Sequence, residues 1–131
     1  MATAIVPVGP ASVYSTPAGR LEASRVYRYL TIRSDASYSR SAPAEELVGL
    51  LATLPGLRQS GPMSFEATPG SPWVSVVLAE CDTLGNYSCD GLPRRRINVI
   101  EVIGSASGDD EWYEGLAART AAFLGWEAVE E

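Results

Sequence analysis

Two segments of this sequence carry apolar residues at helical spacing along one side only, and this pattern restricts the possible folds most strongly. The first segment opens at Pro43, has Glu45 and Glu46 in its first turn, and stops at Pro55-Gly56. Proline and carboxylates favour a helix N-terminus, and glycine favours its end. We therefore predict a helix between these limits. Its buried stripe consists of Leu47, Leu50, Leu51 and Leu54.

The second segment begins with Asp109, Asp110 and Glu111 and ends at Gly125. Acidic residues again fill the first turn, where they complement the helix dipole, and glycine is the usual residue just past a helix. We predict a helix whose buried side consists of Trp112, Leu116, Thr120 and Phe123, flanked by Tyr113 and Leu124.

Four other segments are rich in β-branched and aromatic residues and are predicted to be strands: Val26–Arg33, Gly61–Thr68, Trp73–Asp82 and Ile97–Ile103. Glu101 is the one charged residue inside the last of these. Leu84-Gly85-Asn86 is typical of a tight turn, and residues 126–131 are either a short strand or an acidic tail. The predicted order is β-α-β-β-β-α.

This order indicates an α+β protein with a single, mostly antiparallel sheet of four to five strands and both helices packed on one face. The 131-residue chain is long enough for one core and too short for two. Residues 25–131 therefore form a single domain. Residues 1–24 differ in composition, being rich in Ala, Ser, Pro and Gly. They are either a natural arm, an expression remnant or a start-site artefact.

The charge of the chain excludes several classes of partner. The basic residues number 10, all arginine, against 16 acidic residues, and the net charge is −6. Such a domain repels phosphate backbones and anionic lipids, so we expect neither nucleic acid nor a membrane as partner, and a basic protein suits it better. There is no secretory signal, which makes the cytoplasm the expected compartment.

Catalytic chemistry is restricted because the sequence contains no histidine and two cysteines. Histidine-dependent nucleophilic mechanisms and the common zinc sites are thereby excluded. No phosphate-binding loop or calcium loop is recognisable. We expect no enzyme activity, no cofactor and no metal.

An acidic cluster at the start of the second helix is the first candidate binding surface. Asp110, Glu111 and Glu114 share one outer face, with Tyr113 at the edge of the buried face. These carboxylates either complement the helix dipole on a solvated face or dock a basic partner, for which an exposed aromatic would be a suitable neighbour.

The turn at Gly85 supplies a second candidate. Asp82 and Asp90 bracket it, with Tyr87 beside them. If the turn centres on Gly85, Cys81 and Cys89 face each other across a hairpin, close enough for a disulfide. The alternative in a cytoplasmic protein is two unpaired thiols.

Three stretches, PWVSVVLAECDTLGNY, RINVIEV and DEWYEGLAARTAAFLGWE, make residues 25–129 resemble the small immunity proteins of interbacterial toxin systems such as type VI secretion effectors. The resemblance implies a cytoplasmic protein that binds and blocks one cognate toxin, often through an acidic surface. Two alternatives remain open. One is a domain that binds a small molecule or has a regulatory role, with its ligand between sheet and helices, and the other is an enzyme that uses carboxylates.

Overall fold

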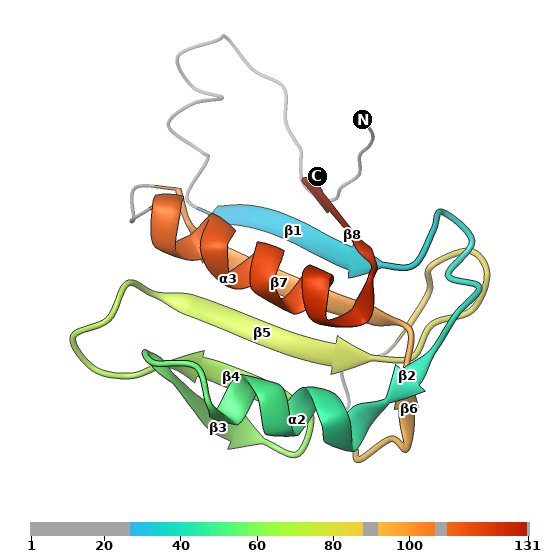
Figure 1. Ribbon diagram of the computed structural model, residues 1–131, viewed down its shortest axis with the longest axis horizontal. Helices are drawn as coiled ribbons and strands as arrows, with labels where there is room; N and C mark the ends of the chain where they lie inside the picture. The colour runs from blue at the N-terminus through green and yellow to red at the C-terminus, as the bar shows by residue number, and fades with distance from the viewer. Residues whose placement is uncertain (1–26, 88–91, 107–109, 131) are drawn as a thin grey trace, which may run out of the picture.

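A computed structural model describes residues 27–87, 92–106 and 110–130 (Figure 1). Two helices and eight strands occur in this part of the chain. In order they are β1 (Tyr27–Arg33), β2 (Ala42–Pro43), α2 (Ala44–Ala52), β3 (Leu57–Gly61), β4 (Ser64–Ala67), β5 (Val74–Ala79), β6 (Arg96–Ile97), β7 (Val99–Ser105), α3 (Asp110–Leu124) and β8 (Glu127–Glu130).

Six of the strands form one sheet in the order β3-β4-β5-β7-β1-β8, and every neighbouring pair is antiparallel. The long strands β5, β7 and β1 lie at its centre, as expected from their runs of β-branched residues. The short strands β2 and β6 pair separately. The predicted α+β class, antiparallel sheet and two helices are confirmed, while the sheet has more strands than predicted.

Both helices lie on the same side of the sheet (Figure 1). One buried cluster joins Leu47 and Leu51 of α2 and Leu116 of α3 to the alternate residues of the central strands. The strand residues that belong to this cluster are Leu30, Ile32, Val74, Val76, Leu78, Ile100 and Val102. Neither helix in the described residues is long and apolar enough to cross a membrane.

The two additional strands are at the edges of the sheet. β3 has the sequence LRQSG with only its first residue buried, so its apolar pattern is too weak to predict a strand. It pairs with β4 through a tight turn, and the predicted strand from Gly61 to Thr68 in fact contains that turn. At the other edge, β8 pairs with β1, which decides between the strand and the acidic tail in favour of the strand.

Helix α2 agrees closely with its prediction. Pro43 is its N-cap, and Glu45 and Glu46 lie in the first turn. Leu47 and Leu51 are fully buried and Leu54 is 8% exposed. The helix ends at Ala52, before the predicted stop at Pro55-Gly56, and Leu50 is only half-buried. The local sequence thus specified the start of this helix and most of its buried side.

Helix α3 ends just before Gly125, as predicted, and Gly125 has φ +70°. The predicted buried side of this helix is wrong in one respect. Phe123 is 50% exposed. The buried residues are Tyr113, Leu116, Ala117, Thr120 and Ala121. Small residues let the helix approach the sheet closely, which rotates Phe123 out of the interface.

A buried asparagine separates β6 from β7, where we predicted one strand from Ile97 to Ile103. The side-chain carbonyl of Asn98 accepts the N–H of Cys81 at 2.8 Å, and its amide donates to the Cys81 carbonyl at 2.9 Å. The same amide donates to the carbonyl of Tyr38 at 3.3 Å. Asn98 therefore ties the end of β5 to the loop after β1, and β5 ends at Ala79 rather than at the predicted Asp82.

Candidate functional site

The sheet has one face against which neither α2 nor α3 packs. Alternate residues of a strand point to opposite faces, and in β1, β5 and β7 one alternate set belongs to the core under the helices. The other set points away, and the strand register arranges it in rows across the three strands. We call this surface the helix-free face. Its rows are Tyr27 and Ser105; Tyr29, Ile103 and Ser75; and Thr31, Glu101 and Val77. Trp73, the residue just before β5, contacts Tyr27 beside the first row.

Three large aromatic side chains are exposed at one end of the helix-free face. Tyr27 and Trp73 are each 47% exposed, and Tyr29 is 42% exposed. The rings of Tyr27 and Trp73 contact each other with their centroids 5.2 Å apart, at an interplanar angle of 46°. Since aromatic surface is normally buried in a domain of this size, the cluster marks a candidate contact surface.

A carboxylate lies at the centre of the same face. Glu101 is half-buried on β7, and Thr31 faces it from β1. Thr31 is 3% exposed, and its hydroxyl donates to this carboxylate with distances of 3.1 Å to Oε1 and 3.3 Å to Oε2. The hydrogen bond holds the carboxylate between the two central strands.

Two arginines on the same face, outside these three rows, are paired with carboxylates on neighbouring strands. Arg33 on β1 donates to Glu127 of β8 at 2.8 Å, and Arg58 on β3 donates to Glu66 of β4 at 2.6 Å. Burial lowers the pKa of Arg33, but the hydrogen bonds to Glu127 and Tyr38 outweigh it, so the pKa is raised above its usual value. Neither arginine therefore makes the face basic.

Tyr38 closes the other end of the face. Its ring packs on Ala79, Cys81 and Val99, in a small cluster separate from the main core. The guanidinium of Arg33 lies 5.5 Å from the centre of the ring. Tyr38 has φ +57°, an uncommon conformation for a residue with a large side chain, so the surrounding loop must hold it in place.

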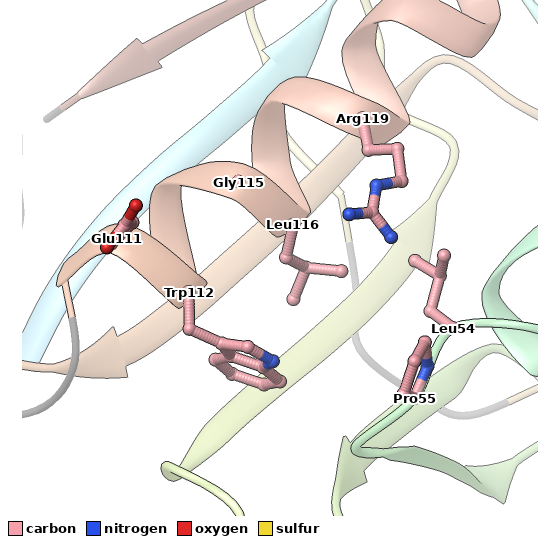
Figure 2. Close-up of a pocket in the computed structure, with 7 residues that line it drawn as sticks. All are labelled: Leu54, Pro55, Glu111, Trp112, Gly115, Leu116 and Arg119. Atoms are coloured by element: carbon pink, nitrogen blue, oxygen red, sulfur yellow. The ribbon is translucent and has the colours of Figure 1, made fainter.

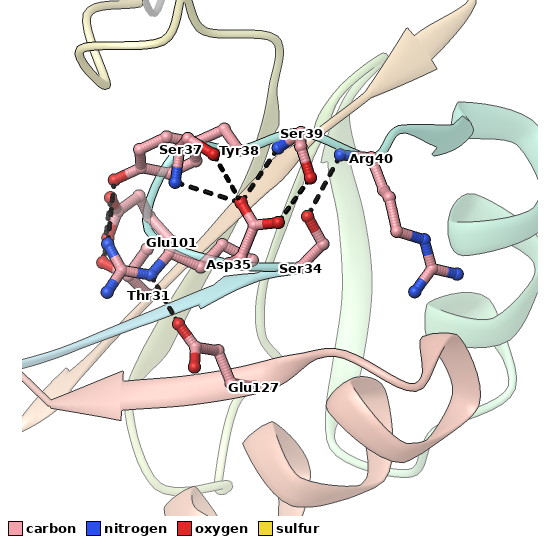
Figure 3. A network of polar contacts seen from close by, with 10 residues as sticks. Thr31, Ser34, Asp35, Ser37, Tyr38, Ser39, Arg40, Glu101 and Glu127 are labelled. Atoms are coloured by element: carbon pink, nitrogen blue, oxygen red, sulfur yellow. Dashed lines mark hydrogen bonds and ion pairs between the residues drawn. The ribbon is translucent and has the colours of Figure 1, made fainter.

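That loop is organised by Asp35 (Figure 3). One carboxylate oxygen accepts the backbone N–H groups of Ser37 and Ser39 at 3.0 and 3.1 Å, and the other accepts the Ser39 hydroxyl. The hydrogen bonds from Ser39, followed by those from Ser37, lower the pKa of Asp35 to about 2. At neutral pH the charged carboxylate therefore fixes the loop that carries Tyr38.

The acidic cluster predicted on the second helix is partly neutralised within the protein. Arg28 of β1 donates to Asp110 at 2.7 Å, to Glu114 at 2.9 Å and to Glu130 of β8 at 2.6 Å. These three carboxylates, Glu130 foremost, raise the pKa of Arg28. Glu111 is exposed. The cluster lies beside the helices, on the side of the sheet opposite the helix-free face.

Tyr113, predicted at the edge of the buried face beside these carboxylates, is buried. It is 4% exposed, and its hydroxyl donates to the backbone carbonyl of Val102 at 2.9 Å. The ring packs over Gly104, where any side chain would meet it. The absence of a side chain at Gly104 leaves room for this ring, which lies within the buried face and not at its edge.

The turn at Gly85 forms as predicted. Gly85 has φ +86°, and the Asp82 carboxylate accepts the N–H groups of Leu84 and Asn86 at 2.9 and 3.0 Å. These hydrogen bonds lower the pKa of Asp82. Its carboxylate therefore stabilises the turn, and Tyr87 packs against the cluster under Tyr38. Asp90 lies outside the described residues.

The proposed disulfide also falls partly outside the described residues, because Cys89 is not among them. Cys81 is buried. Burial, with the nearby Asp82 second, raises the pKa of its thiol to about 11. The thiol is therefore protonated at neutral pH and is a poor nucleophile.

A groove of about 290 Å³ lies between the end of α2 and the first turns of α3 (Figure 2). Leu54, Leu116 and Trp112 form its apolar wall, and Arg119 lies at one end. Its size is at the lower limit of typical small-molecule pockets. This groove is the nearest match to the ligand site of the small-molecule alternative. It lies between the two helices, whereas that alternative placed the ligand between the sheet and the helices.

The aromatic end of the helix-free face was not predicted from the sequence. A signal was present, because Tyr27, Tyr29 and Thr31 alternate with the apolar residues of β1. In the described part of the chain, no group of three or more acidic or cysteine side chains is placed to hold a metal ion. Comparison with protein-family models, curated proteins and solved structures finds no match for the chain.

Proposed function

We propose that this domain is a non-catalytic protein-binding module that blocks a basic cognate protein, as an immunity protein blocks its toxin, in the cytoplasm of the producing cell. The net charge of −6 favours a basic partner. The resemblance of residues 25–129 to immunity proteins supports the same class of partner. Charge of this sign steers a basic protein toward the domain and accelerates association.

The observation that carries the proposal is the exposure of Tyr27, Tyr29 and Trp73 together on the helix-free face. Tyrosine and tryptophan are the residues that most often dominate the energy of protein interfaces. A sheet face of this kind also offers a flat, rigid surface, because the backbone of the three central strands is paired on both sides.

The acidic cluster on α3 is a weaker candidate for the main contact. Asp110 and Glu114 already bind Arg28, so a partner would have to compete with an arginine of the domain itself. Glu111 remains available to a partner at the rim. We therefore assign α3 a role in steering and the helix-free face the role of the principal contact.

The test uses the full chain as bait to isolate a protein partner, followed by measurement of Kd for three variants. Replacing Tyr29 and Trp73 together by alanine should weaken binding by about 30-fold or more, the effect of losing an interface hot spot. Phe123→Ala is the matched control, since Phe123 is equally exposed but lies on α3.

The third variant replaces Asp110, Glu111 and Glu114 by arginine and so reverses their charge. It should slow association at low salt and leave the dissociation rate nearly unchanged. A cognate toxin that binds the double alanine variant as tightly as the wild type would refute the assignment to the helix-free face. A failure to find any protein partner would refute the immunity proposal itself.

The groove beside Trp112 supports the small-molecule alternative. Gly115 lines it, and a side chain at this position would enter open space. Gly115→Leu should therefore fill the groove without disturbing the core. Loss of a small ligand in this variant, with toxin binding absent in the wild type, would favour the alternative.

A further inference from the structure

We propose that the groove between α2 and α3 binds a small elongated carboxylic acid, with its apolar chain along Leu116 and its carboxylate on the guanidinium of Arg119. A medium-chain fatty acid is the simplest ligand of this class. The groove lies on the side of the sheet that carries the helices, opposite the helix-free face. The inference therefore goes beyond the proposed function and does not depend on it.

The first argument is the apolar wall of the groove, which is already fixed in the protein. Leu54 and Leu116 are buried members of the main core. The ring of Trp112 packs against the backbone at Gly56, where an added Cβ would lie 3.0 Å from it. Binding of an apolar chain along this wall therefore requires little ordering of side chains, which favours affinity.

The second argument is the size of the groove. Trp112 and Arg119 lie two turns of α3 apart, a rise of about 10 Å. The volume of about 290 Å³ equals that of about ten water molecules at about 30 Å³ each. A single chain of roughly ten non-hydrogen atoms fits both dimensions. An α-helix of a partner, roughly 10–12 Å across with its side chains, is too wide.

The third argument is the charge at the two ends. Figure 2 shows the guanidinium of Arg119 extending from α3 toward Leu54, across one end of the groove. None of the ion pairs in the described part of the chain involves Arg119. Glu111, the other charged lining residue, lies at the opposite end. A carboxylate is therefore attracted to the Arg119 end, where a planar guanidinium can donate two parallel hydrogen bonds to it.

The net charge of −6 opposes the approach of an anion but does not prevent its binding at this end. Charges in water are screened beyond a Debye length of about 8 Å at physiological ionic strength. Glu111 is about 12 Å from Arg119 along the helix axis. The ligand carboxylate therefore responds mainly to the guanidinium beside it.

The test compares octanoate with its neutral analogue octanamide, each titrated into the ¹⁵N-labelled full chain. Both should shift the indole N–H signal of Trp112 and the amide signals of residues 115–119, because their chains contact the same wall. Octanoate should bind at least about threefold more tightly, within the range of a solvent-exposed ion pair. Butanoate should bind more weakly than octanoate, since each methylene that is fully buried strengthens binding about fourfold.

Two variants and a control decide which groups are responsible. Arg119→Gln should remove the preference for octanoate over octanamide, whereas Arg40→Gln, which removes an exposed arginine from the loop before β2, should retain it. Gly115→Leu should weaken the binding of both probes, because its side chain enters the groove. Arg119 and Gly115 are both exposed, so we expect both variants to fold, and their amide spectra check this.

Four outcomes would overturn the inference. They are the absence of octanoate binding, equal binding of octanoate and octanamide, an unchanged preference in Arg119→Gln, and shifts of the groove signals when the chain is concentrated without a probe, which would mean that a second copy fills the groove. The double alanine variant of Tyr29 and Trp73 should bind octanoate as tightly as the wild type. Loss of octanoate binding in that variant would place the site on the helix-free face and also overturn the inference.

Discussion

The ring of Tyr113 lies directly on Gly104, and its hydroxyl donates to the carbonyl of Val102 two residues earlier on β7. Helix α3 therefore rests on a point of the central strand that has no side chain. The contact sets the distance between helix and sheet, and the guanidinium of Arg28, 4.9 Å from the centre of the same ring, covers it from the solvent side.

Gly104→Ala should destabilise the domain, because the new methyl group would overlap the Tyr113 ring. We expect a loss of roughly 1–3 kcal/mol in the free energy of unfolding, the usual cost of overpacking, measured by urea denaturation. Gly49→Ala is the control. An added methyl group there meets nothing within 4 Å, and it should stabilise α2 by about 0.5–1 kcal/mol. A neutral Gly104→Ala would show that the helix can shift without cost.

Leu51→Ala and Phe123→Ala should differ sharply. Leu51 is fully buried in the core between the helices and the sheet. Its truncation should lower the free energy of unfolding by about 2–5 kcal/mol. Phe123 is 50% exposed, and its truncation should change the stability by less than about 0.5 kcal/mol. Thermal and urea unfolding of both variants would check this, and a large loss for Phe123→Ala would mean that α3 is rotated toward the sequence prediction.

Arg28→Met should destabilise the domain by about 1–2 kcal/mol at low salt, because it leaves three carboxylates from α3 and β8 close together without their common cation. The loss should shrink when NaCl is raised from about 0.05 M to about 1 M, since salt screens the repulsion. Arg58→Met, which breaks one exposed ion pair, should cost less than about 1 kcal/mol at either salt concentration. Equal losses for both variants would contradict the bridging role of Arg28.

Asp35 should make the order of its loop depend on pH. Its pKa is lowered from 3.8 to about 2, so the folded state favours the carboxylate, and this stabilisation is complete above pH 3.8. It is lost as the pH falls through about 2, where the folded carboxylate becomes protonated. The amide signals of Ser37 and Ser39 should titrate with that midpoint and should not titrate in Asp35→Asn. A midpoint near 3.8 would show that the hydrogen bonds do not form in solution.

Features that depend on a few adjacent residues could be predicted from the sequence. The start of α2 follows from Pro43, and the end of α3 follows from Gly125, whereas α2 ends at Ala52, before the proline and glycine at positions 55 and 56. The turn at Gly85 is likewise local. Glu101 was recognised as the one charge inside its strand, but its pairing with Thr31 joins residues 70 positions apart and has no local signal.

The sequence by itself determined the α+β class, the start of α2 with its buried Leu47 and Leu51, and the absence of histidine chemistry, since these follow from residue types and short-range periodicity. Only the tertiary structure decided that Tyr113 is buried and Phe123 exposed, that β3 and β8 extend the sheet, and that Tyr27, Tyr29 and Trp73 share an exposed face. A strand pattern shows that alternate residues point in opposite directions. Which direction receives the helices depends on contacts between distant segments, because packing on Gly104 and pairing with Arg28 position α3, and the surface that α2 and α3 do not cover is the consequence.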